Sequence, residues 1–232
     1  MRFKAPFTAV LAAPSCSGKT TWVLKLLRFL PEIVDGDIHH IVWCYGEEGA
    51  IPPEVASDDN IRKFEGVPTE DSGILVPKTL ILVDDLMHEA YNETISKVYT
   101  RISHHREVSM ILISQNVLFQ SPHARNISLS TKYFILLRNC RERSQFAYLA
   151  RQIYPENPKS LCEALFDAWS EPFGYLVVDV NPQQSSDAVR FRRNIWPSDP
   201  YTIVYANRAS IGKLQSGGGD CPCVSMTAKD LH

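Results

Sequence analysis

The segment that most constrains the fold of this 232-residue chain is Ala13-Pro-Ser-Cys-Ser-Gly-Lys-Thr20. It matches the pattern G-x-x-x-x-G-K-[ST], except that Ala13 stands in place of the first glycine. The apolar run at residues 7–12 predicts a strand before it, and the pattern at residues 19–30 predicts a helix after it, ended by Pro31. A loop in this position is typical of sites that bind the phosphates of a nucleotide.

Each position of this loop has a distinct chemical task. Main-chain N–H groups and the positive end of the helix would hold a phosphate, Lys19 would bridge the β- and γ-phosphates, and Thr20 would bind Mg²⁺. The chain therefore predicts a site for ATP and Mg²⁺ with these binding residues: Ala13, Pro14, Ser15, Cys16, Ser17, Gly18, Lys19, Thr20 and Thr21. Ala13 fits only if its φ is not positive, since its Cβ disfavours that conformation.

Two carboxylates follow the apolar run Leu80-Ile-Leu-Val83, which reads as a strand buried on both faces. Asp84 would lie at the end of this strand, where it can hold Mg²⁺. Asp85 is the candidate that polarises the attacking water. A second polar group, Gln115, follows the apolar run at residues 109–114 and would orient that water, with Ser114 and Asn116 as supporting or loop-capping groups.

Strands and helices alternate along most of the chain, which predicts an α/β fold. We expect a P-loop NTPase three-layer sandwich with a mainly parallel central sheet. An additional strand is expected between the Walker A and Walker B motifs, because residues 40–45 read as a strand between the loop and Asp84. Further strands are expected near 61–64 and at 133–137, and an antiparallel pair at 174–179 and 189–193; further helices are expected at about 89–103, 142–153 and 159–170.

The expected domains are an ATPase domain over residues 1–205 and a flexible Gly/Ser-rich tail over residues 206–232. Cys221 and Cys223 lie in that tail without a nearby histidine or second cysteine pair, so a flexible tail fits better than a zinc site. No apolar run reaches the roughly 18 residues of a membrane-spanning helix, and no secretion signal is evident. These features favour a soluble protein of a reducing compartment.

Charge is segregated along the chain although the formal net charge is only −2. Residues 32–97 carry four basic and fifteen acidic groups, whereas residues 98–151 carry eight basic and two acidic groups. Such a chain can present an anion-binding face, or the arginines can simply form a solvated helix face. The candidates for gripping nucleic acid are Arg141, Arg143, Arg190, Arg192 and Arg193.

With these motifs in place, the chain resembles the DNA-packaging ATPases of Polinton (Maverick) elements and adintoviruses, within the FtsK–HerA superfamily that also holds the poxvirus and adenovirus packaging ATPases. The resemblance covers about residues 6–197. Besides the phosphate loop, it rests on Val42-Trp-Cys-Tyr-Gly46, Phe64-Glu-Gly-Val-Pro68, Val83-Asp-Asp-Leu-Met87, Ser103-His-His-Arg106, Ile113-Ser-Gln-Asn116, Leu149-Ala-Arg-Gln-Ile-Tyr-Pro155, Gly174-Tyr-Leu and Arg193-Asn-Ile195.

This resemblance implies a homo-oligomeric ring that moves double-stranded DNA into a preformed capsid, with capsid or portal-vertex proteins as partners. It implies action in the host nucleus or in association with the virion. In a ring, an arginine of a neighbouring subunit can complete the site; Arg125 and Arg138 are the candidates, ahead of Arg101 and Arg106. Two other classes stay open: another P-loop ATPase acting on nucleic acid, helicase-like or mobilising, and a non-catalytic nucleotide-binding scaffold.

Overall fold

The computed structural model describes residues 2–47, 49, 51–84, 86, 93–102, 105–117, 121–139, 141, 143–183 and 187–206. Its strands are β1 (Phe3–Lys4), β2 (Thr8–Ala12), β3 (Val34–Asp35), β4 (His40–Tyr45), β5 (Ile61–Glu65), β6 (Thr79–Asp84), β7 (Ser109–Ser114), β8 (Tyr133–Leu137), β9 (Tyr175–Asp179), β10 (Phe191–Arg193) and β11 (Ile203–Tyr205). Its α-helices are α1 (Lys19–Arg28), α2 (Leu30–Ile33), α3 (Pro53–Ala56), α4 (Glu93–Lys97), α6 (Ala124–Ser130), α7 (Arg143–Ile153) and α8 (Pro158–Ala168).

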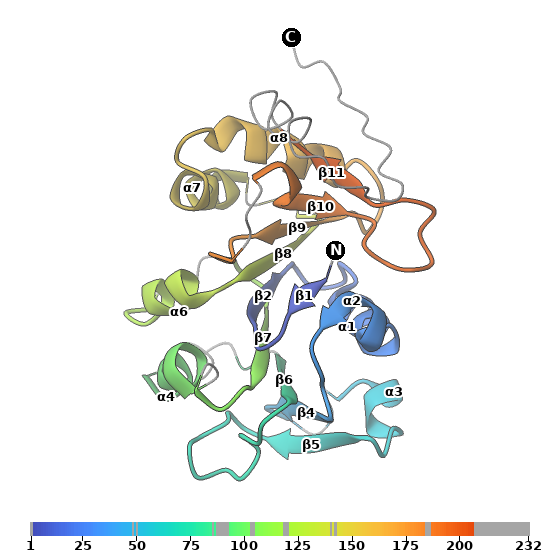
Figure 1. The fold of residues 1–232 in the computed structure, drawn as a ribbon, viewed down its shortest axis with the longest axis vertical. Helices are drawn as coiled ribbons and strands as arrows, with labels where there is room; N and C mark the ends of the chain where they lie inside the picture. The colour runs from blue at the N-terminus through green and yellow to red at the C-terminus, as the bar shows by residue number, and fades with distance from the viewer. Residues whose placement is uncertain are drawn as a thin grey trace.

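Nine of these strands form one sheet in the order β11-β10-β9-β8-β2-β7-β6-β4-β5. The six strands from β8 to β5 are parallel, and β9, β10 and β11 are added by successive antiparallel pairings. Figure 1 shows these strands stacked along the long axis of the molecule, from β5 at the bottom to β10 and β11 at the top. The mainly parallel sheet that the sequence predicts is therefore confirmed.

Helices cover both faces of this sheet, so the molecule has three layers. In Figure 1, α1 and α2 lie on one side of the strands, and α4, α6 and α7 lie on the other. The side chains of β2 alternate between the two cores: Val10 and Ala12 belong to the core that includes residues of α7 and α8, whereas Ala9 and Leu11 belong to the core that includes residues of α1. All five residues of β2 are buried, which explains its continuous apolar sequence.

The strand that separates β2 from β6 in the sheet is β7. The expectation of an additional strand rested on residues 40–45, which form β4 and lie on the far side of β6. The expected layout is present, but a later strand of the chain supplies it. Order along the chain does not give order in a doubly wound sheet, since long crossovers let successive strands insert between earlier ones.

Several boundaries differ from the sequence prediction. The first helix ends at Arg28 rather than at Leu30, and Pro31 lies in the first turn of α2, where its missing N–H is tolerated. The helix expected at 89–103 is seen as α4 followed by a π-helical segment, Val98–Ile102, within the described residues. Helix α6, strand β11 and the small parallel pair of β1 with β3 were not predicted.

The tail at 207–232, with Cys221 and Cys223, lies outside the described residues. Within the described part of the chain, no helix is both long enough and apolar enough to cross a bilayer.

Candidate nucleotide-binding site

The phosphate loop connects β2 to α1 at the carboxyl end of the parallel strands. Cys16 and Gly18 have φ angles of 61° and 91°, and these left-handed residues turn the chain into α1. Ala13 is not among the residues with positive φ and is 1% exposed, so its Cβ packs in the core instead of straining the loop. The loop therefore accommodates alanine at this position, and the condition that φ of Ala13 is not positive is met.

The amino end of α1 is open to an anion. Gly18 is the N-cap, no side chain caps the helix within the described chain, and its first turn holds no acidic residue. The first main-chain bond of the helix runs from Trp22 N–H to the Gly18 carbonyl, at 2.9 Å. The earlier N–H groups of the helix thus have no intrahelical acceptor, which is the arrangement that binds phosphate.

Lys19 lies along the loop that it follows. Its Nζ donates to the carbonyl oxygens of Ala13 at 2.9 Å and Pro14 at 3.1 Å. Ser17 Oγ donates to the same Pro14 carbonyl at 2.6 Å. These bonds place the lysine ammonium at the loop, where it can contact a bound phosphate, while Thr20 and Thr21 are exposed in the first turn of α1.

The register of the strands brings Asp84, at the end of β6, to the edge of the sheet where the phosphate loop lies. Ala12 pairs with Ser114 of β7, and Ile113 of β7 pairs with Asp84 of β6. Neighbouring strands are spaced about 4.8 Å apart, so the backbones of Asp84 and Ala12 lie roughly 10 Å apart across β7. Asp84 is half-buried at the end of β6. Asp85 lies outside the described residues.

The residues after β7 form a compact turn. Ser114 Oγ donates to the Asn116 carbonyl at 2.9 Å and accepts from Asn116 N–H at 3.2 Å. These bonds confirm Ser114 as a capping group. Gln115, between them, lines a cavity of about 650 Å³ that we call the phosphate cleft; its walls are Pro14, Ser15, Cys16, Ser17, Gln115, Asn116, Arg138, Asn139, Arg141, Pro172 and Phe173.

The two candidate arginines lie in different places. Arg138 follows β8, donates its backbone N–H to the Gly174 carbonyl at 2.9 Å, and lines the phosphate cleft of its own chain. Arg125 is exposed on α6 and lines a different cavity, beside Tyr148 of α7. Arg106 is exposed just before β7, and Arg101 lies in the π-helical segment. The sequence placed Arg138 near the next strand but did not indicate that it faces its own phosphate loop.

Two of the arginines that were expected to bind nucleic acid form ion pairs with carboxylates of their own chain instead. Arg192 is 3% exposed in β10, and its Nη2 donates to Asp179 Oδ2 at 3.1 Å. Arg193 lies 3.9 Å from Asp167 and 3.7 Å from Glu171. The expectation for Arg192 is wrong, because a buried guanidinium requires a carboxylate partner and is not available to DNA. Arg141 and Arg143 are exposed.

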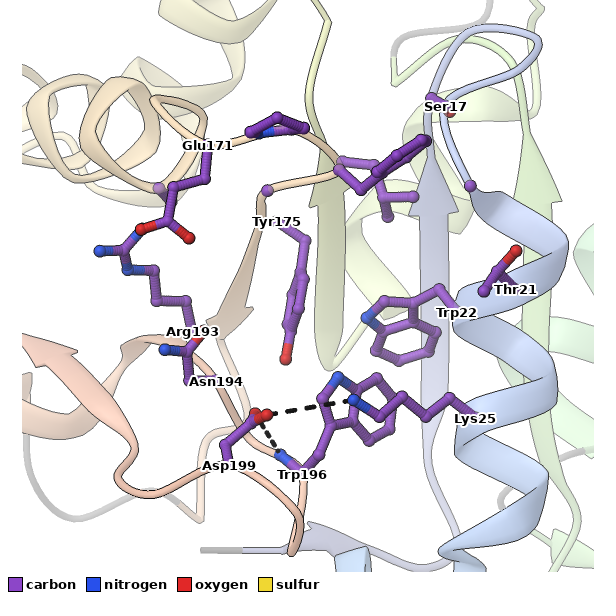
Figure 2. Close-up of a pocket in the computed structure, with 16 residues that line it drawn as sticks. Ser17, Thr21, Trp22, Lys25, Glu171, Tyr175, Arg193, Asn194, Trp196 and Asp199 are labelled. Atoms are coloured by element: carbon purple, nitrogen blue, oxygen red, sulfur yellow. Dashed lines mark hydrogen bonds and ion pairs between the residues drawn. The ribbon is translucent and has the colours of Figure 1, made fainter.

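Sequence reasoning missed the loop between α8 and β9, whose Phe173 covers the phosphate loop. A Cβ on Gly18 would lie 3.2 Å from Phe173 Cδ1, and Phe173 itself adopts a φ of 57°. Beyond Phe173 lies a second cavity of about 400 Å³, which we call the aromatic cavity, bounded by Trp22, Phe173, Tyr175 and Trp196 (Figure 2). No sequence motif predicts this cavity, because its aromatic residues come from segments that lie far apart in the sequence.

Comparison with known proteins gives a match at the level of structure only. No family model matches the chain, and no curated protein matches it. The genome packaging NTPase B204 from Sulfolobus turreted icosahedral virus 2, in complex with sulfate, superposes with a TM-score of 0.53 at 14% identity, over 77% of this chain and 94% of that one.

The AMPPCP complex of the same B204 protein superposes with a TM-score of 0.50, also at 14% identity and over the same shares of the two chains. At this identity the likeness is one of fold, and it confirms that this chain has the P-loop NTPase sandwich.

Proposed function

We propose that this protein is an ATP-driven motor that moves double-stranded DNA into a preformed viral capsid. One observation carries the proposal: the phosphate loop, Asp84, Gln115 and Arg138 meet at one edge of the sheet, in a fold shared with a viral genome packaging NTPase. The finer assignment to the Polinton or adintovirus type rests on the sequence resemblance.

The phosphate loop would hold the triphosphate of ATP. The uncapped amino end of α1 and the Lys19 ammonium both favour negative charge at this point. The B204 complexes with sulfate and with AMPPCP are in line with this use of the fold. Thr20 and Asp84 provide the oxygen ligands that Mg²⁺ prefers, and would hold the ion whose charge stabilises the phosphates when it is bound.

Gln115 would orient the water that attacks the γ-phosphate. It lines the same cleft as residues 14–17 of the loop, and the Ser114–Asn116 turn fixes its backbone. Asp85, next to Asp84 in the sequence, is the proposed group that polarises this water. Arg138 lines the same cleft and would stabilise the charge that develops on the γ-phosphate from within the same subunit.

In a ring, Arg125 would then be the arginine that completes the ATP site of a neighbouring subunit. It is exposed on α6, and it does not line the phosphate cleft of its own chain. Arg141 and Arg143 are exposed basic groups that would contact DNA phosphates. Binding through phosphates is salt-dependent and largely independent of sequence, as a packaging motor requires.

Steady-state ATP turnover tests the proposal, measured for the wild type and for Lys19→Ala with long double-stranded DNA, with single-stranded DNA and without DNA. We expect turnover that double-stranded DNA stimulates most and that Lys19→Ala reduces by at least about 100-fold. Stronger stimulation by single-stranded DNA would favour the helicase-like alternative. Tight ATP binding without turnover in assembled protein would contradict the motor and favour the scaffold.

A further inference from the structure

The aromatic cavity adjoins the phosphate loop but is separate from the phosphate cleft. Ser17, Pro172 and Phe173 line both spaces, so Phe173 stands at the boundary between them. The aromatic cavity is also lined by Gly18 and Thr21, from the loop and the first turn of α1. A molecule bound on the loop therefore has direct access to this cavity. Its volume of about 400 Å³ lies within the range of small-molecule sites, roughly 300–1,000 Å³.

Three of the four aromatic walls, Trp22, Tyr175 and Trp196, are buried and held in place before any ligand arrives, whereas Phe173 is 68% exposed. The Trp22 ring centroid lies 5.1 Å from that of Trp196 and 6.0 Å from that of Tyr175. The Tyr175 hydroxyl accepts from Ile195 N–H at 3.1 Å, and Trp196 N–H donates to Asp199 at 3.1 Å. A preorganised aromatic wall of this kind favours a flat apolar group, because little side-chain entropy is lost on binding.

One polar atom of the wall lacks a partner. Trp22 is 5% exposed, and its Nε1–H has no acceptor among the described residues. Figure 2 shows this nitrogen on the side of the indole away from α1, facing Tyr175. A buried N–H without an acceptor is unfavourable, so the position suits a ligand that brings an acceptor atom.

The charges that line the cavity are balanced. Lys25 Nζ lies 4.0 Å from Asp199 and 5.1 Å from the centroid of the Trp196 ring. Arg193 lies 3.7 Å from Glu171. Because both cations lie beside a carboxylate, the cavity has no surplus of positive charge for a second anion, in contrast to the phosphate loop. A neutral aromatic group with hydrogen-bond acceptors fits it best.

We propose that the aromatic cavity receives the purine nucleoside of the nucleotide, with Trp22 Nε1–H donating to an acceptor of the nucleoside. The inference rests on the proposed function, since it takes the phosphates to lie on the loop. Stacking grows with ring area, so the cavity favours purine over pyrimidine nucleotides. Trp22 would then contribute to the preference for purine nucleotides. It lies two residues after Thr20, beyond the end of the phosphate-loop sequence pattern.

The test compares two probes on the full chain with Mg²⁺: ATP, and inorganic tripolyphosphate, which carries the phosphates without the nucleoside. Affinities are measured by calorimetry for the wild type, Trp22→Phe, Trp43→Phe and Lys19→Ala. Trp43→Phe is the matched control, because Trp43 is also a buried tryptophan whose Nε1–H has no acceptor among the described residues, yet it lies in β4 and lines neither cavity.

We expect the wild type to bind ATP at least about 10-fold more tightly than tripolyphosphate, in line with stacking of one base on aromatic side chains. We expect Trp22→Phe to weaken ATP about 3- to 10-fold, through loss of one hydrogen bond, and to leave tripolyphosphate unchanged. Trp43→Phe should change neither affinity, and UTP should bind the wild type more weakly than ATP.

Equal wild-type affinities for ATP and tripolyphosphate would overturn this inference alone, and that comparison needs no variant to fold. So would a Trp22→Phe effect that is the same for both probes, or no larger than that of Trp43→Phe. Failure of the wild type to bind either probe, or binding that Lys19→Ala leaves intact, would instead overturn the proposed nucleotide site, and this inference with it.

Discussion

The backbone N–H of Ala13 donates to the carbonyl oxygen of Ser114 across 3.0 Å. The first residue of the phosphate loop is thus attached to the residue that precedes Gln115. This bond continues the pairing of β2 with β7 beyond the last ladder pair, Ala12 with Ser114. It makes the positions of the loop and of the Gln115 backbone depend on each other.

Gln115→Ala should lower kcat by about 100-fold while changing KM by less than about 3-fold, because Gln115 would act on the water rather than on the bound nucleotide. Steady-state kinetics with ATP measure both constants. Gln183→Ala, at an exposed glutamine after β9 that lines none of the cavities described above, is the control and should match the wild type. A rise in KM with unchanged kcat would assign Gln115 to nucleotide binding instead.

Gly18→Ala should destabilise the protein through its backbone conformation, and by a further amount only if the Phe173 ring, which is 68% exposed, does not shift aside. A φ of 91° costs a residue with a Cβ about 1–2 kcal/mol, and the new Cβ would meet Phe173 at 3.2 Å. Gly66→Ala isolates the first effect, since Gly66 has a φ of 84° and nothing lies within 4 Å of its Cβ position. Urea denaturation measures the free energy of unfolding of each variant.

Adding Phe173→Ala to Gly18→Ala should restore part of the lost free energy of unfolding. The part restored should equal the amount by which the loss in Gly18→Ala exceeds the loss in Gly66→Ala. If Gly18→Ala and Gly66→Ala lower the free energy of unfolding equally, Phe173 does not press on the phosphate loop.

Arg192→Met should lower the free energy of unfolding by about 3–5 kcal/mol, because it leaves the Asp179 carboxylate, 2% exposed, without its cation. Adding Asp179→Asn should restore much of the loss. Lys97→Met removes the exposed ion pair with Glu93 and should leave stability nearly unchanged, since exposed pairs are screened by water. Thermal and urea unfolding provide the measurements; an Arg192→Met variant as stable as Lys97→Met would refute the structural role.

Cys16 should be the most reactive thiol among the described cysteines. It is exposed in the phosphate loop, whereas Cys44 is buried and Cys162 is half-buried. Burial raises the pKa of the Cys44 thiol to about 12 and also raises the pKa of Cys162, so both stay protonated at neutral pH. Alkylation with iodoacetamide, followed by peptide mass spectrometry, measures the rate at each cysteine.

Mg²⁺ and ATP should protect Cys16 from alkylation in the wild type and not in Lys19→Ala. Cys16→Ser identifies the modified peptide. Alkylation of Cys16 at the same rate with and without nucleotide would place the phosphates away from the loop.

The sequence predicted the parts of the site that lie on short continuous segments. The phosphate loop, the strand that ends at Asp84 and the strand before Gln115 are each one run of residues whose pattern is local. Their meeting at one edge could also be expected, because the carboxyl ends of parallel strands share an edge. Which strand separates β2 from β6 was not predicted, since that depends on crossovers and not on any local pattern.

The remainder of the site depends on contacts between distant segments. Phe173 reaches Gly18 across 155 positions of the sequence, and the aromatic cavity joins α1 to the loops around residues 173 and 196. The number and order of charged residues in the sequence likewise do not show that Arg192 is buried and paired with Asp179. From the sequence alone, Arg192 was therefore expected to be a basic surface residue. Side-chain partners across a sheet require the register, which sequence periodicity alone does not supply.

The central claim is that ATP hydrolysis drives movement along double-stranded DNA, and displacement of a triplex-forming oligonucleotide from a long duplex tests it most directly. We expect the wild-type protein to displace the third strand with ATP while the duplex stays paired, and we expect no displacement with AMPPCP or by Lys19→Ala. Rapid ATP hydrolysis that leaves the triplex in place, or release that proceeds by separating the duplex strands, would contradict the account.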